Sequence, residues 1–226
     1  MMNLNELYSI LSNTYGRQNW WPTTVKGDLY PTYHTNPVDA RMRYEIAVGA
    51  VLTQNTAWSN VKKAIYKLNN LNLMNPDIIS VDNDYLILQA IKPSGFYNIK
   101  LKRLKNLTEW WLKNSELLLD ERQRNKRVDY WRDSLLEVKG IGFETADDIL
   151  LYCFDLPTFV IDTYTKRAMV RHFNISENID YNNLRKYFMD RLPTDIFLYK
   201  EYHALFVKLN KLDCTKKECM KTCPLR

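Results

Sequence analysis

A turn with two glycines between two helical runs restricts the fold of this chain more than any other stretch. It lies in VKGIGFETA, residues 138–146, and contains Gly140 and Gly142. Glycine has no Cβ, so such a turn can be tight and can present its backbone N–H groups to a ligand. Apolar residues recur at helical spacing from Ala146 onward, and a glycine turn that opens a helix is a geometry that binds phosphate. A glycine pair alone, however, favours an ordinary connection between helices.

A lone acidic residue, Asp162, opens another helical run in VIDTYTKR, twenty residues after Gly142. Aspartate is a preferred helix N-cap, and this role contributes about 1 kcal/mol. From its position alone, Asp162 is therefore interpreted as a cap.

The hairpin and the spaced aspartate together resemble the helix-hairpin-helix superfamily of DNA glycosylases, the endonuclease III group. Two further segments, residues 47–65 and 91–107, look like family segments and occur in the family order. The resemblance implies an all-α, two-lobed fold. Residues 44–160 would form the helical lobe with the hairpin, and residues 1–43 plus 161–226 the second lobe. DNA would lie in the cleft between the lobes.

The resemblance also implies which residues bind DNA. In the family the hairpin grips a phosphate through backbone N–H groups, and a loop before a basic helix wedges against the opposite strand. The residues assigned to DNA binding are Lys139, Gly140, Gly142, Thr145, Tyr97 and Lys100. Lys and Arg exceed Asp and Glu by 32 to 26, which suits a polyanionic partner. The basic run at residues 121–127 is interpreted as solvated surface.

Aromatic residues are candidates for a base pocket. Adjacent Trp20 and Trp21 cannot share one face of a helix or strand, so one can be core while the other lines a groove. The sequence Trp20-Trp21-Pro22 is similar to 3-methyladenine glycosylases of the endonuclease III type, where it belongs to the pocket. The family uses the residue matching Gln54 to fill the hole left by a flipped nucleotide, and Trp58 falls where an aromatic ring meets the base. The structural alternatives are that the tryptophans fasten the N-terminal arm or pack on a surface neighbour.

The resemblance makes Asp162 the catalytic carboxylate, which stabilises the oxocarbenium-like sugar and orients water. Relatives that also cut the strand carry a lysine immediately before the hairpin threonine. This chain has Glu144 there, which cannot form an imine. The sequence therefore predicts a monofunctional glycosylase in base excision repair. A cationic alkylated purine such as 3-methyladenine is the expected substrate, because aromatic rings attract cations.

Two alternative functions stay open at the level of sequence. One is an endonuclease III-like glycosylase with AP lyase activity on oxidised pyrimidines or mismatches. The other is a non-catalytic helix-hairpin-helix protein that only binds DNA.

Three cysteines, Cys214, Cys219 and Cys223, lie near the end of the chain. Many relatives end with four cysteines that hold a [4Fe–4S] cluster, spaced by six, two and five residues. Here the spacing is four and then three, so the tail is interpreted as a degraded or truncated cluster site. The alternatives are a cluster, or zinc bound with a borrowed histidine. No cofactor is expected for the chemistry.

The remaining expectations concern context. The N-terminus lacks the pattern of a signal peptide, and no stretch has the apolar length of a membrane span. We expect a monomer that acts on double-stranded DNA in the cytoplasm, associated with the nucleoid and not with a membrane. Residues 23–43 contain three prolines and read as a loop, for which the sequence offers no functional account.

Overall fold

The computed structural model describes residues 3–34, 38–81, 84–120 and 128–226. The basic run at residues 121–127 lies outside these ranges. Within them the regular elements are helices, and β-structure is limited to two isolated bridges, Thr23 with Thr32 and Cys214 with Cys219. The predicted all-α fold is confirmed. Each helix in the described ranges is too short or too polar to cross a membrane.

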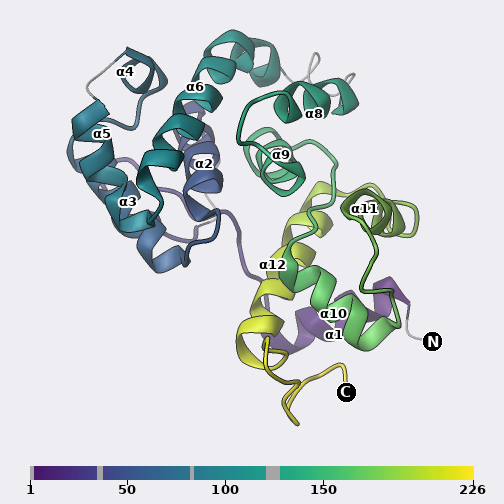
Figure 1. Ribbon diagram of the computed structural model, residues 1–226. Helices are drawn as coiled ribbons and strands as arrows, with labels where there is room; N and C mark the ends of the chain where they lie inside the picture. The colour runs from purple at the N-terminus through teal and green to yellow at the C-terminus, as the bar shows by residue number, and fades with distance from the viewer. Residues whose placement is uncertain (1–2, 35–37, 82–83, 121–127) are drawn as a thin grey trace. The chain divides into compact units, whose positions relative to one another are not determined.

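The chain divides into two compact units, and the first combines both ends of the sequence, Met1–Trp20 and Pro157–Arg226. Its helices are α1 (Leu4–Tyr15), α10 (Thr163–Phe173), α11 (Tyr181–Met189) and α12 (Ile196–Leu212), as labelled in Figure 1. Helix α12 is central to this unit. The rings of Tyr202 and Phe206 stack at 5.0 Å, and Phe188 of α11 packs edge-on against both.

The second unit is Trp21–Leu156 and contains the hairpin. Its elements, in chain order, are α2 (Ala40–Thr53), α3 (Trp58–Asn70), α4 (Pro76–Val81), α5 (Asp84–Ile91), the short 3₁₀-helix η1 (Lys92–Ser94), α6 (Tyr97–Leu119), α8 (Val128–Leu136), α9 (Phe143–Asp148) and the π-helical turn η2 (Ile149–Cys153).

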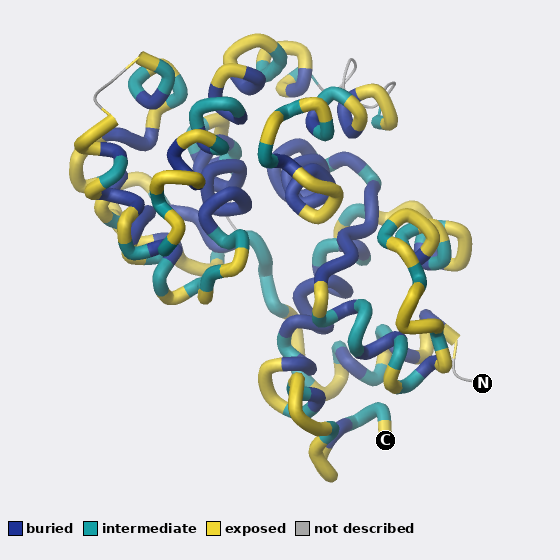
Figure 2. Tube along the Cα trace, in the orientation of Figure 1, coloured by how far each residue is buried: buried dark blue, intermediate teal, exposed yellow. Residues whose placement is uncertain are grey.

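Helix α2 is the core of the second unit. Every residue from Tyr44 to Leu52 is buried, and the helix is dark along most of its length in Figure 2. Apolar and small residues occupy all of its faces in that stretch, which is typical of a helix surrounded by protein. The single charged residue in it is Glu45, whose carboxylate is hydrogen-bonded on several sides.

Residues 21–34 and 38–43 belong to the same compact unit as the hairpin, whereas the sequence analysis grouped residues 1–43 with the second lobe. The physical reason is the buried carboxylate of Glu45. It accepts hydrogen bonds from the Thr24 amide (2.7 Å) and hydroxyl (2.8 Å), so it fastens the start of this segment to α2. Asn69 of α3 donates to both Thr24 and Glu45. The segment is mainly loop, closed by the bridge between Thr23 and Thr32.

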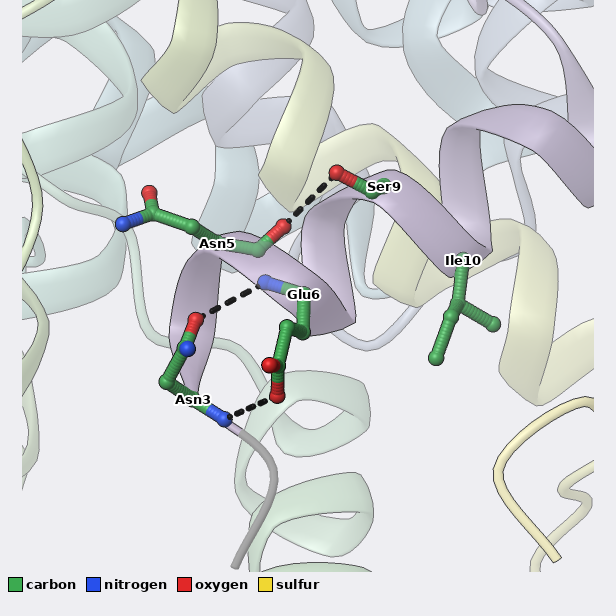
Figure 3. Close-up of a pocket in the computed structure, with 5 residues that line it drawn as sticks. All are labelled: Asn3, Asn5, Glu6, Ser9 and Ile10. Atoms are coloured by element: carbon green, nitrogen blue, oxygen red, sulfur yellow. Dashed lines mark hydrogen bonds between the residues drawn. The ribbon is translucent and has the colours of Figure 1, made fainter.

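Helix α1 begins with a reciprocal cap. The Asn3 side chain accepts from the Glu6 amide at 2.9 Å, and the Glu6 carboxylate accepts from the Asn3 amide at 3.0 Å (Figure 3). A surface hollow of about 580 Å³ lies along the first turns of α1. It is lined by Asn3, Asn5, Glu6, Ser9 and Ile10. None of the residues predicted to act on DNA lines it.

Candidate active site

Asp162 occupies the N-cap position of α10 in the first unit. Its Oδ1 accepts a hydrogen bond from the Thr165 amide at 2.6 Å, so the cap that the sequence predicted is present. Its Oδ2 lies 3.5 Å from Nε2 of His203, which α12 supplies. Both side chains are buried. The carboxylate is therefore fixed at both oxygens, one by the helix terminus and one by an imidazole.

These contacts keep Asp162 ionised although it is buried. Burial on its own raises the pKa of the carboxyl group. The hydrogen bond and charge of His203, together with the hydrogen bonds from Thr165, outweigh burial and hold the pKa below its ordinary value. A buried carboxylate that stays charged can stabilise positive charge on a sugar or orient a water molecule.

His203 is a site residue that the sequence analysis missed. It lies within α12, and the sequence around a histidine in a helix does not indicate which aspartate it will contact. The indole of Trp20 packs edge-on against its ring, with centroids 5.6 Å apart. Trp20 is half-buried and belongs to the same unit as Asp162.

The second unit contains an aromatic cluster of Trp21, Trp58 and Tyr152. The Trp21 ring packs edge-on against Trp58 at 5.7 Å and against Tyr152 at 5.3 Å. Gly49 of α2 makes room for it, because a Cβ on this glycine would stand 3.3 Å from the Trp21 indole nitrogen. The Trp58 indole nitrogen is buried and has no hydrogen-bond acceptor among the described residues. The sequence analysis did not identify Tyr152 as a member of this cluster, because its position in an apolar run predicts an ordinary core residue.

Pro22 is buried, while Trp20 and Trp21 are half-buried. The two tryptophans contact different partners, as adjacent residues must when they cannot share a face. Pro22 stands at the beginning of the segment that Thr24 fastens to α2.

The hairpin between α8 and α9 depends on Gly140. This residue has φ +101°, and a Cβ there would lie 2.3 Å from Cγ of Arg103. Gly142 has φ −100° and open space around it, so the turn does not require a glycine at that position. Among the described residues, the N–H groups of Gly140 and Gly142 have no backbone acceptor. Lys139 next to them is exposed.

Gln54 connects this hairpin to the end of α2. Its amide nitrogen donates to the Gly140 carbonyl (3.2 Å) and the Thr145 hydroxyl (3.0 Å), and its amide oxygen accepts from Arg103 at 2.5 Å. The structure thus brings together Gln54, Gly140 and Thr145, three of the predicted residues. It gives Gln54 a further role in holding the hairpin. The next residue, Asn55, is exposed with φ +53°.

Lys100 does not have the environment of a phosphate-binding residue, and this prediction needs correction. Only 1% of the residue is exposed. Its ammonium group donates to the Leu52 carbonyl (2.8 Å), the Thr56 hydroxyl (2.6 Å) and the Ser94 carbonyl (2.7 Å). Burial lowers its pKa to about 8, and the charge of Arg103 adds to the shift. Lys100 is therefore a buried connection between the loop after α2, which contains Thr56, and the loop around Ser94 that leads into α6.

One of these loops presents Phe96, a residue that the sequence analysis passed over in favour of Tyr97. Phe96 is 68% exposed and has φ +46°, a conformation that is a real outlier for a bulky side chain. Tyr97, the first residue of α6, is half-buried. The resemblance to the family's wedge loop assigned Lys100 to DNA, whereas the exposed aromatic ring of this loop is Phe96, four residues earlier.

The three cysteines of the tail lie beside His172 of α10. The Nε2 atom of His172 is 3.4 Å from the Cys214 sulfur, 3.8 Å from that of Cys219 and 3.8 Å from that of Cys223. All three cysteines are free thiols. The C-terminus thus gathers side chains that can bind a metal ion or cluster. His172 comes from a helix 42 residues before Cys214, so sequence spacing alone did not reveal it.

A family model described as "HhH-GPD superfamily base excision DNA repair protein" matches residues 48–194. A Methanocaldococcus jannaschii protein, provisionally named a DNA repair glycosylase, is 41% identical over 222 residues, covering 98% of this chain and 93% of that protein. Endonuclease III of Sulfolobus acidocaldarius is 28% identical over 183 residues, covering 79% and 78%.

Two solved structures have a similar fold. The H. pylori 3-methyladenine DNA glycosylase bound to 1,N6-ethenoadenine has a TM-score of 0.71 and 25% identity, with 93% of this chain and 98% of that chain covered. A non-covalent endonuclease III–DNA complex has a TM-score of 0.75 over 100% of this chain and 94% of that one. Its identity of 17% shows a shared fold alone.

Proposed function

Because this chain belongs to the HhH-GPD superfamily of base excision DNA repair proteins and is a DNA glycosylase, we propose that it is monofunctional and releases alkylated purines such as 3-methyladenine from double-stranded DNA. The single observation that carries the monofunctional part is Glu144. It is exposed in the first turn of α9, immediately before Thr145, at the position where lyase relatives carry their lysine. A carboxylate there cannot attack the sugar to form an imine.

The proposed reaction is hydrolysis at the anomeric carbon. The bond from this carbon to the base nitrogen breaks, the base leaves with the bonding electrons, and the sugar gains oxocarbenium character. Asp162 stabilises that charge and accepts a hydrogen bond from the water that adds to the same carbon. His203 and Thr165 hold the carboxylate in place for this role. The water proton passes to the carboxylate and then to solvent, and an intact abasic strand remains.

The aromatic cluster supports an alkylated purine as the substrate. Trp21, Trp58 and Tyr152 offer π faces, and 3-methyladenine in DNA carries a positive charge that such faces attract. The buried Trp58 indole N–H, which has no acceptor in the described residues, is available to donate to a base. The likeness to a 3-methyladenine glycosylase that binds ethenoadenine points in the same direction.

One observation favours glycosylase-lyase activity as a second candidate. Lys211 on α12 lies within electrostatic range of Asp162. Lys211 is exposed as a whole; partial desolvation of its amine lowers the pKa of that amine, and the carboxylate raises it by a smaller amount. A lowered pKa leaves more of the neutral amine, the form that attacks a sugar carbonyl. In that mechanism Lys211 would replace the missing lysine before Thr145.

The test is base release from DNA treated with a methylating agent, with the products resolved, in the presence and absence of borohydride. Free 3-methyladenine with intact abasic strands and no trapped adduct supports the proposal. An adduct that Lys211→Arg abolishes supports the lyase instead. Release of oxidised pyrimidines or mismatched thymine, with methylated bases left in place, would overturn the substrate assignment.

A glycosylase of this kind meets single damaged bases and needs no second copy of itself for the reaction above. We therefore propose that it works as a monomer on the DNA of the nucleoid.

A further inference from the structure

We propose that His172, Cys214, Cys219 and Cys223 bind a single Zn²⁺ ion, in place of the four-cysteine [4Fe–4S] cluster of many relatives. The ligands come from two places in the first unit. His172 lies in the last turn of α10, and the cysteines lie in the tail that follows α12.

The distances from the His172 nitrogen to the three sulfurs fit one tetrahedral ion. With Zn–S near 2.3 Å and Zn–N near 2.0 Å, a tetrahedral angle separates nitrogen and sulfur ligands by about 3.5 Å. The three distances from His172 Nε2 to the cysteine sulfurs are 3.4, 3.8 and 3.8 Å. The ligand atoms of His172, Cys219 and Cys223 also lie within 4.8 Å of one another. Three thiolates and one imidazole form a known ligand set for structural zinc.

The same geometry does not fit a [4Fe–4S] cluster. Such a cluster takes four cysteine thiolates, each on its own iron atom, so its ligands surround a whole cube of atoms. Here the tail offers three cysteines. The remaining cysteine of the chain, Cys153, is buried in η2 of the second unit. The ligand atoms of His172, Cys219 and Cys223 lie within 4.8 Å of one another, closer than ligands that surround a cube of iron and sulfur atoms. The spacing of four and three residues, which departs from the cluster pattern, agrees with this arrangement.

The surroundings supply a positive charge beside the proposed site. Three thiolates, one neutral imidazole and one Zn²⁺ ion carry a net charge of −1. The Arg171 guanidinium donates to the Cys214 sulfur at 3.3 Å and to the Thr215 carbonyl at 2.7 Å, so a cation offsets that charge and holds the tail. The bridge between Cys214 and Cys219 folds the tail back so that both sulfurs reach the same side.

The proposed ion would join the C-terminal tail to the helix that Asp162 caps. Residues 213–226 form no helix, and among the described residues their attachment to α10 runs through Arg171 and the cluster around His172. Zinc would therefore act as a structural crosslink, as it does in small domains that cannot stabilise a loop by packing alone.

The experiment measures metal content in the purified full-length protein, which is prepared under reducing conditions, by elemental analysis and by its visible spectrum. We expect about one zinc per chain and no iron-sulfide absorption. Replacing the ion with Co²⁺ should give the intense visible bands of a tetrahedral site with thiolate ligands. The variants His172→Ala and Cys219→Ser should retain less than a tenth of the zinc under mild chelation that leaves the wild type loaded.

The matched control is Cys153→Ala, which removes a thiol outside the proposed site and should leave the zinc content unchanged. Circular dichroism of each variant shows whether it is folded, and wild-type metal content decides the question if a variant does not fold. Iron and sulfide in the wild type, a disulfide between two of the tail cysteines, or an absence of zinc after incubation of reduced protein with Zn²⁺ would each overturn the proposal.

Discussion

Arg132 and Asp147 form a two-point ion pair within the hairpin unit, with Nε to Oδ1 at 2.8 Å and Nη2 to Oδ2 at 3.1 Å. Arg132 lies in α8 and Asp147 in α9, so the pair clamps together the two helices that the hairpin connects. Both residues are buried, and the guanidinium also lies 5.2 Å from the centre of the Phe143 ring. The turn between these helices is therefore held on one side by Gln54 and on another by this ion pair.

Asp147→Ala should lower the free energy of unfolding by about 3–5 kcal/mol, because it leaves the Arg132 charge buried without its partner. Denaturant unfolding followed by circular dichroism measures the change. The control is Asp133→Ala on α8, an exposed residue whose loss should cost less than about 0.5 kcal/mol. A loss below 1 kcal/mol for Asp147→Ala would mean that packing alone holds the two helices together.

Gly140→Ala should weaken the hairpin, since it forces φ +101° on a residue with a Cβ and drives that atom into Arg103. We expect a loss of stability of about 1–3 kcal/mol and weaker binding to DNA. Gly142→Ala is the matched control, because it meets open space at φ −100° and should be tolerated. Thermal melts and fluorescence anisotropy with an abasic-site analogue measure the two effects. Equal losses in the two variants would contradict the assignment of the turn to Gly140.

Asp162→Asn should reduce base release by about 10²–10⁴-fold, the range typical of a lost acid–base or charge-stabilising group. Asparagine also caps helices well, so α10 should remain formed. Asp180→Asn provides the comparison, because Asp180 caps α11 in the same unit and is exposed. Single-turnover release should be normal in that variant. Unchanged release by Asp162→Asn would remove this carboxylate from the mechanism.

The pH dependence of stability follows from the lowered pKa of Asp162. A carboxylate whose pKa is lower in the folded state than its ordinary value of 3.8 stabilises the fold above that value, and this stabilisation is lost as the pH falls through the folded pKa. The difference in melting temperature between the wild type and Asp162→Asn should therefore be largest above about pH 4 and shrink in more acidic buffer. A difference that grew on acidification would mean that the buried group carries a raised pKa.

Lys100→Met should destabilise the protein, since it leaves two carbonyls and a hydroxyl without the donor that now reaches them. A cost of about 1–3 kcal/mol is expected. Lys102→Met, two residues along the same helix, replaces an exposed lysine and should leave stability unchanged. Equilibrium unfolding separates the two variants. Normal stability with weaker DNA binding in Lys100→Met would restore the original assignment to phosphate contact.

Local sequence patterns located the features that arise from neighbouring residues. The glycine turn, the helical runs and the capping role of Asp162 all depend on side chains within a few positions of one another. Partners that meet through the fold were not predictable in this way. His203 reaches Asp162 from α12, and His172 reaches the cysteines from α10, 42 residues before Cys214. Lys100 was assigned to DNA because its loop resembles the family's wedge loop, whereas the three acceptors that surround its ammonium group come together only once α2, η1 and α6 are packed.

The order of the two units along the chain affects how this protein is made. The hairpin unit, Trp21–Leu156, is a continuous insertion between the two parts of the unit that carries Asp162. In that outer unit the Tyr202 hydroxyl donates to the Leu4 carbonyl at 2.9 Å, which joins residues 198 positions apart. During synthesis the inserted unit can fold while the ribosome is still adding α12, since domains generally fold as their residues emerge. The outer unit closes only when the last helix arrives. Chains that stop before α12 would therefore carry the hairpin unit without His203, which lies 3.5 Å from the Asp162 carboxylate in the complete outer unit.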